Sequence, residues 1–329
     1  MIISRAPVRI SLGGGGTDIA SYYSNHGGFL IAGSINKYIY LCVNKRFDES
    51  IRLSYSKTEI VRTVDSIKHR IFREAFKLLG IQWGIEAVSI ADVPANCGLG
   101  SSSVFTVSLL NALHHYKREY VTLEQLAEEA CKIEIEILGE PIGKQDQYMA
   151  SFGGLTCLTF NKDGHVTVEP LKIEPHVLNQ LESNLLLFYT RMERSASDIL
   201  ADQTESVRKA EVKAVDAMHH IKEIGFRTRK AFESGDLDSF GRMLDEHWQT
   251  KKKLSTKISD PFIDDCYSEG LRSGALGGKI IGAGGGGFLL FYCPQDHAKL
   301  IDAMNKKGLL WMPFRFEYEG AKIVANLTH

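Results

Sequence analysis

The sequence predicts an α+β protein built from two lobes. Segments with strand-like alternation and segments with helical spacing follow one another along 329 residues, which is enough chain for two large cores. The pattern breaks at Glu174-Pro175-His176, so we expect one lobe at residues 1–172 and the other at 173–329. Beyond that break the expected order is strand, helices, strand, strand, helix, strand, which is typical of a ferredoxin-like layer.

In the first lobe, a run of four glycines, Gly13 to Gly16, follows the opening strands. Thr122 and Gln125 have the spacing of a capping box at a helix start. Residues 161–164, Asn-Lys-Asp-Gly, are typical of a hairpin turn. The predicted strands are 2–5, 8–12, 35–43, 51–54, 84–90 and 155–160, and the predicted helices are 67–79, 104–115 and 123–138.

In the second lobe, Gly225 is expected to end a long helix, and an amphipathic helix is expected between Leu237 and Trp248. Asp260-Pro261 supplies an N-cap followed by proline at the first helical position. The other predicted helices are 195–224, 261–272 and 295–307, and the predicted strands are 185–189, 279–281, 288–292, 314–318 and 323–327.

Composition narrows the class of function. The 39 Lys and Arg residues nearly balance the 40 Asp and Glu residues, so no overall basic charge points to nucleic acid. No apolar run approaches the ~20 residues needed to span a bilayer, and the first residues lack the pattern of a secretory signal peptide. We therefore expect a cytoplasmic protein with no membrane partner. The six cysteines include no Cys-x-x-Cys pair, which argues against a structural zinc site or a disulfide framework.

Residues 94–103, Pro-Ala-Asn-Cys-Gly-Leu-Gly-Ser-Ser-Ser, lie between a predicted strand and a predicted helix. Gly98 and Gly100 allow the backbone to turn tightly and approach a ligand closely. The first amides of the helix have no partner within it and attract anions, and serine hydroxyls there could bond a phosphate or ligate magnesium. An ordinary glycine-serine loop with a serine cap explains the stretch equally well.

Two other glycine motifs fail the usual nucleotide-binding tests. Residues 282–287 contain Gly-x-Gly-x-x-Gly, but an apolar strand follows where the dinucleotide fingerprint needs a helix. This turn, with Gly284 and Gly285, can form a backbone wall against a ligand or simply pack between elements. Residues 139–144 are one residue short of a P-loop, Gln145 stands where Ser or Thr is required, and the protein-kinase motifs are absent.

Three motifs occur in order along the chain: Ala6-Pro7-Val8-Arg9-Ile10-Ser11-Leu12, residues 94–102, and residues 279–288. Together they resemble the signature motifs of the GHMP kinase superfamily, and the resemblance spans nearly the whole chain. It implies a first lobe similar to ribosomal protein S5, with ATP held between the lobes by the middle motif. The residues that it places on the ATP phosphates are Gly98, Leu99, Gly100, Ser101, Ser102 and Ser103.

Phosphoryl transfer needs an acceptor hydroxyl, a group that takes its proton, and positive charge near the phosphate. Asp146 lies in a polar cluster after a predicted helix; an Asx turn is the commoner explanation from the residues alone, whereas the resemblance implies the catalytic base. The resemblance makes Arg9 the cation that keeps this base ionised and stabilises the transferring phosphate. It also makes Ser102 and Glu134 the magnesium contacts, with Glu136 as the alternative to Glu134.

Asp18 follows the glycine run as Gly-Gly-Gly-Thr-Asp, where galactokinases carry Gly-Glu-His-Thr-Asp. The resemblance places Asp18 on sugar hydroxyls, with Thr17 and Gly15 beside it. Two missing side chains leave room for a sugar other than galactose. Together with Gly-Lys-Gln-Asp-Gln-Tyr at 143–148, this motif resembles the branch that phosphorylates the anomeric hydroxyl of D-glycero-D-manno-heptose 7-phosphate to give the 1,7-bisphosphate.

A phosphorylated sugar needs its own anion site. Arg191 and Arg194 precede a predicted helix start and offer cations beside free helix amides, although a solvated turn with capping serines explains them equally well. The alternative functions are another sugar kinase, either fucokinase-like or acting on unphosphorylated heptose, and a non-catalytic sensor of ATP and sugar. The sequence does not predict the oligomeric state.

Overall fold

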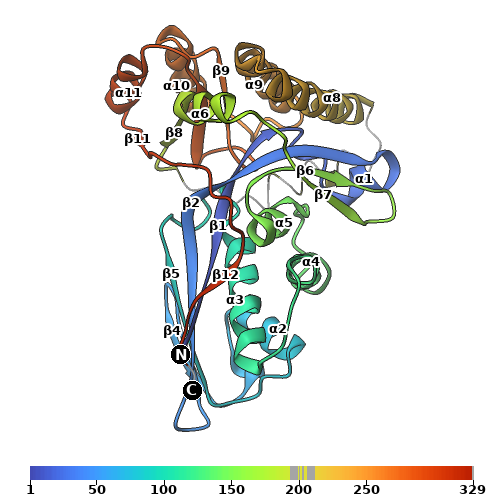
Figure 1. Ribbon diagram of the computed structural model, residues 1–329, viewed down its shortest axis with the longest axis vertical. Helices are drawn as coiled ribbons and strands as arrows, with labels where there is room; N and C mark the ends of the chain where they lie inside the picture. Colours follow the sequence, from blue (N-terminus) through green and yellow to red (C-terminus); the bar gives the residue numbers. More distant parts are fainter. Residues whose placement is uncertain (193–198, 200, 202–203, 206–211, 328–329) are drawn as a thin grey trace.

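The structure, a computed structural model, describes residues 1–192, 199, 201, 204–205 and 212–327. Two sheets with helices packed on them make up the fold, an α+β arrangement as predicted (Figure 1). Within the described ranges, no helix is both long and apolar enough to cross a membrane.

The larger sheet has eight strands, and its centre is the long antiparallel pair β1 (Ile2–Gly13) and β2 (Gly28–Lys45). Along its other edge, β2 pairs first with β6 and then with β5, so this sheet divides into two arms. Its path is β12-β1-β2-β5-β3-β4, with the β6–β7 hairpin on the second arm. The remaining strands are β3 (Ile51–Ser54), β4 (Thr58–Val61), β5 (Ile85–Ala91), β6 (Leu155–Phe160), β7 (Val166–Pro170) and β12 (Lys322–Asn326).

Helix α3 (Ser101–Lys117) packs on β1 and β2 and is buried on nearly all sides. Every residue from 103 to 114 is buried, which explains why the helix is apolar around most of its circumference rather than along one stripe. A helix held this firmly fixes the position of the loop that leads into it. The other helices of this lobe are α1 (Ala20–His26), α2 (Arg70–Leu78), α4 (Leu123–Cys131) and α5 (Gln145–Phe152), with short turns at η1 (Val64–Ser66) and η2 (Lys132–Ile137).

The smaller sheet has four antiparallel strands in the order β11-β8-β10-β9. Numbered along the chain, this is fourth, first, third, second, which confirms the predicted ferredoxin-like layer. The strands are β8 (Leu185–Tyr189), β9 (Gly277–Ile280), β10 (Phe288–Tyr292) and β11 (Leu310–Trp311). The helices around them are α6 (Pro175–Asn184), α8 (Val212–Ser234), α9 (Leu237–Lys252), α10 (Pro261–Arg272) and α11 (His297–Lys306).

Several predicted elements were wrong in type or extent. Residues 2–12 form one strand, because a register shift between Pro7 and Val8 accommodates the proline without breaking the pairing. Residues 314–318 form no strand: only Phe316 makes a bridge, to Ile35, and β11 completes the smaller sheet instead. Part of the predicted helix 195–224 lies outside the described residues. The short helices α1, α5 and α6 were not predicted, since seven to ten residues carry too little periodic signal.

Strand β12 follows the second lobe along the chain but pairs with β1 in the larger sheet. The two ends of the chain therefore lie together in Figure 1. Strands β1 to β7 end at Pro170, and the smaller sheet begins at Leu185. The boundary between lobes near residue 173 stays a prediction.

Gly225 lies inside α8, so the prediction that it ends a helix was wrong. Its missing side chain serves close packing instead. A Cβ at this position would lie 3.2 Å from the Gly14 Cα and 3.3 Å from the Phe29 carbonyl oxygen. The glycine therefore lets α8 pack directly on the glycine run after β1.

We expect Gly225→Val to lower the free energy of unfolding by about 1–3 kcal/mol, because the added side chain is forced into this contact. Lys230→Val is the matched control, since position 230 is exposed on the same helix and loses only helix propensity, about 0.5 kcal/mol. Urea denaturation measures both values. Equal losses in the two variants would contradict the packing role of Gly225.

Candidate active site

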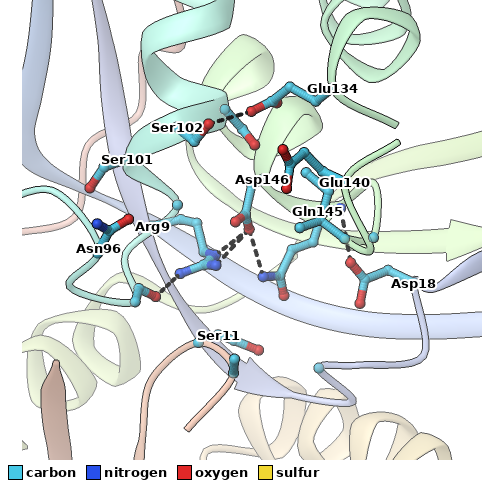
Figure 2. A pocket seen from close by; sticks show the side chains of 18 of the residues that line it. Arg9, Ser11, Asp18, Asn96, Ser101, Ser102, Glu134, Glu140, Gln145 and Asp146 are labelled. Carbon is cyan, nitrogen blue, oxygen red and sulfur yellow. Dashed lines mark hydrogen bonds and ion pairs between the residues drawn. The ribbon is translucent and has the colours of Figure 1, made fainter. Parts of the chain in front are cut away.

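A cavity of about 810 Å³ lies between the two lobes, within the size range of small-molecule sites. Its lining comes from β1 and the turn after it, the loop before α3, and the start of α5 (Figure 2). The second lobe contributes α9, β9 and the turn after β9. The polar side chains in this lining include Arg9, Ser11, Asp18, Ser101, Ser102, Ser103, Glu134, Gln145, Asp146, His247, Lys251 and Lys279.

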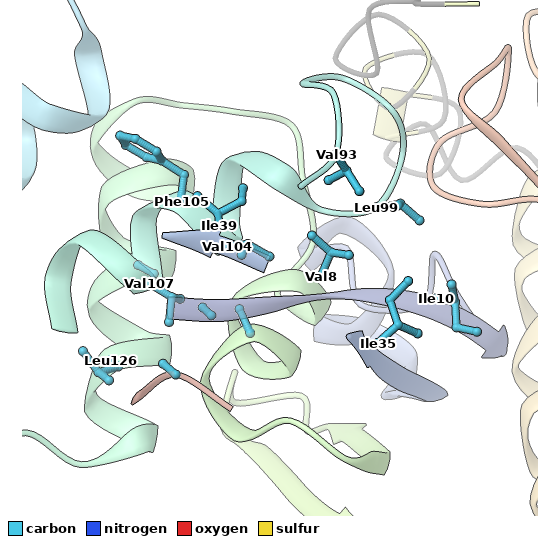
Figure 3. Packing of buried hydrophobic residues seen from close by; sticks show 14 of the residues in the cluster. Val8, Ile10, Ile35, Ile39, Val93, Leu99, Val104, Phe105, Val107 and Leu126 are labelled. Carbon is cyan, nitrogen blue, oxygen red and sulfur yellow. The ribbon is translucent and has the colours of Figure 1, made fainter. Parts of the chain in front are cut away.

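The loop before α3 is held by buried apolar side chains. Figure 3 shows Val93 and Leu99 of the loop in the same apolar cluster as Val8 of β1, and the Leu99 carbonyl accepts a hydrogen bond from the Arg9 amide at 3.3 Å. Leu99 is thus a core anchor and does not line the cavity, whereas the other five residues predicted on the ATP phosphates do.

Gly98 and Gly100 both have positive φ angles, of 83° and 80°, which favour glycine. A Cβ on Gly98 would lie 2.4 Å from the Ile281 carbonyl oxygen, and one on Gly100 would lie 2.9 Å from Asp146 Oδ2. The two glycines therefore let the loop approach both the second lobe and the carboxylate of Asp146. Helix α3 begins at Ser101, so its free amides point toward this junction.

Arg9, which is buried, and Asp146, which is partly exposed, form an ion pair at the centre of the site. Arg9 donates to Asp146 Oδ1 from Nε at 2.7 Å and approaches it with Nη2 at 2.6 Å, while Nη1 donates to the Gly98 carbonyl at 2.7 Å. Gln145 Nε2 also donates to Oδ1 at 3.0 Å. Within the described part of the chain, no group donates to Oδ2. One carboxylate oxygen is therefore held by the protein, and the other is left for a ligand.

Glu134 and Ser102 form a second pair beside Asp146. The Ser102 hydroxyl donates to Glu134 Oε1 at 2.6 Å, and Gln147 Nε2 donates to Oε2 at 2.9 Å. Burial raises the pKa of Glu134 to about 7, although the hydrogen bond from Ser102 opposes the shift. The π-helical turn η2 carries Glu134 on its buried side, whereas Glu136 is exposed and does not line the cavity.

The pair has the chemistry of a magnesium site that substrate completes. Magnesium prefers oxygen ligands and usually keeps water and phosphate oxygens in its shell. The Ser102 hydroxyl and the Glu134 carboxylate are adjacent oxygen donors at the cavity wall. In the described ranges no group of three His, Cys, Asp or Glu side chains could hold a metal alone. These two residues fit an ion that arrives with a phosphorylated ligand.

Asp18 lies on the other side of Asp146 (Figure 2). Its Oδ1 accepts a hydrogen bond from the Gly16 amide and its Oδ2 one from the Gln145 amide, each at 3.1 Å. Burial, followed by the charge of Asp146, raises the pKa of Asp18. Thr17, which was predicted beside it on the sugar, bonds the Gly14 and Phe29 carbonyls and does not line the cavity.

Two buried polar atoms near Gly15 lack a partner among the described residues: Ser11 Oγ and Gln145 Oε1. A Cβ on Gly15 would lie 2.4 Å from Ser11 Oγ and 3.7 Å from Gln145 Oε1, so both atoms face the same glycine. Because an unpaired buried polar group is costly, these atoms are suited to the hydroxyl groups of a ligand. Sequence reasoning missed Ser11, although it lies two residues after Arg9 on the same face of β1.

Other predicted residues lie away from the cavity. Gly284 and Gly285 pack against Ile258, and the wall after β9 consists of Gly282 and Ala283 instead. Arg191 is exposed and does not line the cavity, and Arg194 lies outside the described residues. Sequence reasoning also missed His247, Lys251 and Lys279; the four-residue spacing of the first two on one helix was the available signal.

Comparisons with known proteins show the family of this chain. Family models described as the GHMP kinases N-terminal domain and the GHMP kinases C terminal match residues 60–154 and 228–309. The chain is 31% identical over 337 residues to the D-glycero-alpha-D-manno-heptose 7-phosphate kinase of Campylobacter jejuni, covering 98% of each chain.

Solved structures of sugar kinases also resemble this chain. A D-glycero-D-manno-heptose 1-phosphate kinase from Bacteroides thetaiotaomicron superimposes with a TM-score of 0.82 at 26% identity, covering 100% of both chains. A Lactococcus lactis galactokinase complexed with galactose superimposes with a TM-score of 0.79 at 17% identity, covering 98% of this chain and 94% of that one. The second similarity is one of fold alone.

Proposed function

This chain belongs to the GHMP kinase family, and we propose that it phosphorylates the anomeric hydroxyl of D-glycero-D-manno-heptose 7-phosphate, using ATP, to give the 1,7-bisphosphate. It is a sugar kinase, an enzyme that transfers phosphate to a hydroxyl group. Kinases of this family use ATP as the co-substrate. The choice of heptose 7-phosphate and of the anomeric position is the proposal.

The names of two relatives support a phosphorylated heptose but differ in the position of its phosphate. The C. jejuni relative is named for a 7-phosphate and the B. thetaiotaomicron structure for a 1-phosphate. A sugar that already carries phosphate at position 1 has no free anomeric hydroxyl. We follow the 7-phosphate because that relative shares the higher identity over nearly the whole chain. Its name also specifies the α anomer, which we adopt for the substrate.

The Arg9–Asp146 pair is the observation that carries the proposal. In the proposed reaction, Asp146 Oδ2 takes the proton of the sugar hydroxyl. The hydroxyl oxygen bonds to the γ-phosphorus of ATP while the bond between that phosphorus and the departing ADP breaks. Arg9 holds Oδ1 and also bonds the Gly98 carbonyl, so one side chain links the base to the phosphate loop. Amides at the start of α3 stabilise phosphate charge.

Magnesium belongs to the proposal, with Ser102 and Glu134 as its protein ligands. When bound, the ion neutralises charge on the ATP phosphates. Asp18, Ser11 and Gln145 would bond hydroxyl groups of the sugar, because their polar atoms border the cavity near Gly15.

A panel of acceptors tests the function. ADP release is measured with heptose 7-phosphate, unphosphorylated heptose, heptose 1-phosphate, L-fucose and galactose, and the new phosphate is located by phosphorus NMR. We expect heptose 7-phosphate to give the highest kcat/KM and a product with phosphates at positions 1 and 7. A preference for L-fucose or unphosphorylated heptose would replace the proposed substrate, and no turnover with any acceptor would favour a sensor.

The metal assignment makes a separate prediction. Glu134→Gln is expected to weaken magnesium-dependent ATP binding about tenfold, because the neutral amide is a poor ligand for a hard cation. Calorimetric titration of ATP with and without magnesium measures the effect. Because Glu134 has a pKa of about 7, the magnesium-dependent gain of the unmodified protein should fall as the pH drops below 7 and the carboxylate takes up a proton.

Glu136→Gln is the matched control, since Glu136 is exposed on the same turn. It should bind ATP as the unmodified protein does. A loss in Glu136→Gln without one in Glu134→Gln would overturn the assignment of Glu134.

A further inference from the structure

Three basic side chains are buried together where the second lobe meets the cavity. His247 and Lys251 lie four residues apart on one face of α9, and Lys279 lies on β9, against which α9 packs. Their exposed fractions are 1%, 9% and 3%. All three line the cavity. We call His247, Lys251 and Lys279 the basic cluster.

Hydrogen bonds hold the basic cluster in place. Lys279 Nζ lies 3.4 Å from His247 Nδ1, and His247 also bonds the Gly15 backbone. Lys251 Nζ donates to the Gly282 carbonyl at the cavity wall. Burial keeps the pKa of His247 well below its usual value, so the imidazole is neutral and accepts from Lys279. His247 is therefore a positioning residue, and the two lysine amines are the groups that can donate to an anion.

The two lysines have no anionic partner of their own. In the part of the chain that the structure describes, no carboxylate forms an ion pair with Lys251 or Lys279, and the nearby Arg9 is already paired with Asp146. Asp18 is the acid whose charge acts on Lys251. Burial and then the charges of neighbouring cations lower the pKa of Lys251 to about 8 and that of Lys279 well below its usual value. Buried cations are normally paired, so a ligand that brings an anion would satisfy this site.

The position of the basic cluster indicates which anion it would meet. Figure 2 shows the Ser102–Glu134 pair on one side of Asp146 and Asp18 and Ser11 on the other. The loop amides and the proposed magnesium ligands belong to the first side. The basic cluster reaches the second side through His247, which bonds the Gly15 backbone, and through Asp18, whose charge acts on Lys251 together with that of Arg9. Lys251 also bonds the Gly282 carbonyl, and Gly282 packs on Gly98 of the phosphate loop, so the cluster lies where the two sides meet. An anion held beside Gly15 and Asp18 comes from the acceptor, because these residues border the proposed sugar position and the magnesium ligands lie across Asp146.

We infer that Lys251 and Lys279, oriented by His247, bind the phosphate group that the sugar already carries before the reaction. This inference rests on the proposed function, and it moves the anion site from Arg191 and Arg194 to the interior of the cavity. It gives the selection of a phosphorylated sugar a physical basis: only a phosphorylated sugar supplies the counter-charge that favours the protonated form of two buried lysines.

Lys251→Met and Lys279→Met test the inference. We expect each variant to raise the KM for heptose 7-phosphate about 10- to 100-fold, because a charge-assisted hydrogen bond to phosphate is lost. The KM for ATP should stay within twofold, and kcat/KM for unphosphorylated heptose within threefold. Lys252→Met is the control: Lys252 neighbours Lys251 but pairs with Asp264 outside the cavity. Equal losses with both sugars, or a raised KM for ATP, would assign the lysines to the transferring phosphate and overturn the inference.

A binding measurement separates this inference from the proposed reaction. Heptose 7-phosphate, and inorganic phosphate as a second probe, are titrated calorimetrically into the unmodified protein and the variants without ATP. We expect Lys251→Met and Lys279→Met to weaken binding of the sugar phosphate at least about tenfold, and Lys251→Arg to weaken it less. Unchanged binding in the methionine variants would overturn the inference whether or not the protein turns over. Binding that depends on the lysines, without turnover of any sugar, would defeat the proposed function alone.

Folding of the variants is checked by thermal denaturation. Methionine keeps most of the lysine's apolar stem and removes a buried amine that has no anionic partner among the described residues, so the melting temperature should not fall. If Lys279→Met fails to fold, Lys279→Gln replaces it in the kinetic and the calorimetric measurements. The same results then support or overturn the inference.

Discussion

Asp146→Asn is expected to lower kcat by about 10²- to 10⁴-fold, because the amide cannot accept the proton of the sugar hydroxyl. Asparagine has nearly the same shape, and its carbonyl oxygen can still accept from Arg9 and Gln145 where Oδ1 does now. The substitution therefore removes the proposed base and leaves its surroundings in place. Steady-state ADP release at saturating ATP and sugar phosphate measures the loss.

Two further measurements make the Asp146→Asn result specific. The variant should fold but melt at a lower temperature, because the buried Arg9 loses its charged partner, and it should bind ATP within about threefold of the unmodified protein. Asp163→Asn in the exposed turn before β7 is the control and should keep full turnover. An Asp146→Asn variant with kcat within tenfold of the unmodified protein would rule out Asp146 as the general base.

Arg9→Met is expected to lower kcat/KM about 10²- to 10³-fold, the range seen when a donor that stabilises transition-state charge is removed. Arg9 makes two kinds of contact at once: it holds Asp146 Oδ1 and it bonds the Gly98 carbonyl of the phosphate loop. Methionine loses both. Arg9→Lys keeps the charge but lacks the planar guanidinium needed for both contacts. Its kcat/KM should therefore lie between those of the unmodified protein and Arg9→Met.

Arg5→Met is the control for Arg9→Met, because Arg5 lies on the same strand and pairs with Glu317 and Glu319 away from the cavity. It should change kcat/KM less than about threefold, because neither Arg5 nor its two partners line the cavity. Similar losses in Arg5→Met and Arg9→Met would indicate a general effect on β1 and not a role for Arg9 in the reaction.

Local patterns predicted the features that depend on local chemistry. The order of strands and helices after residue 174 predicted the ferredoxin-like sheet, since β8, β9 and β10 are short runs between turn signals, but the two-residue strand β11 was too short to predict. The glycine-serine loop was predicted because positive φ angles at Gly98 and Gly100 demand glycine. The Arg9–Asp146 pairing required the resemblance, because 137 positions separate the two residues and no periodicity links them.

Features that depend on packing between distant segments were missed. Gly225 has the local signature of a helix end, yet it serves close contact with Gly14. The basic cluster becomes visible only when α9 lies on β9, because a lysine on a helix is usually solvated. The argument for Arg191 and Arg194 used local helix-start chemistry, and it could not show that Arg191 faces away from the cavity.

The pairing of β12 with β1 affects how the segments that line the cavity are held relative to one another. Residues 171–321 leave the larger sheet and return to it, so the segment that carries the basic cluster is tethered at two points rather than one. A double tether restricts rotation of that segment about a single hinge, and this limits movement of Lys251 and Lys279 relative to the rest of the cavity lining. Ile2 pairs with Asn326, so joining the two ends by a short linker and opening the chain at an exposed turn should yield a circular permutant with an intact site.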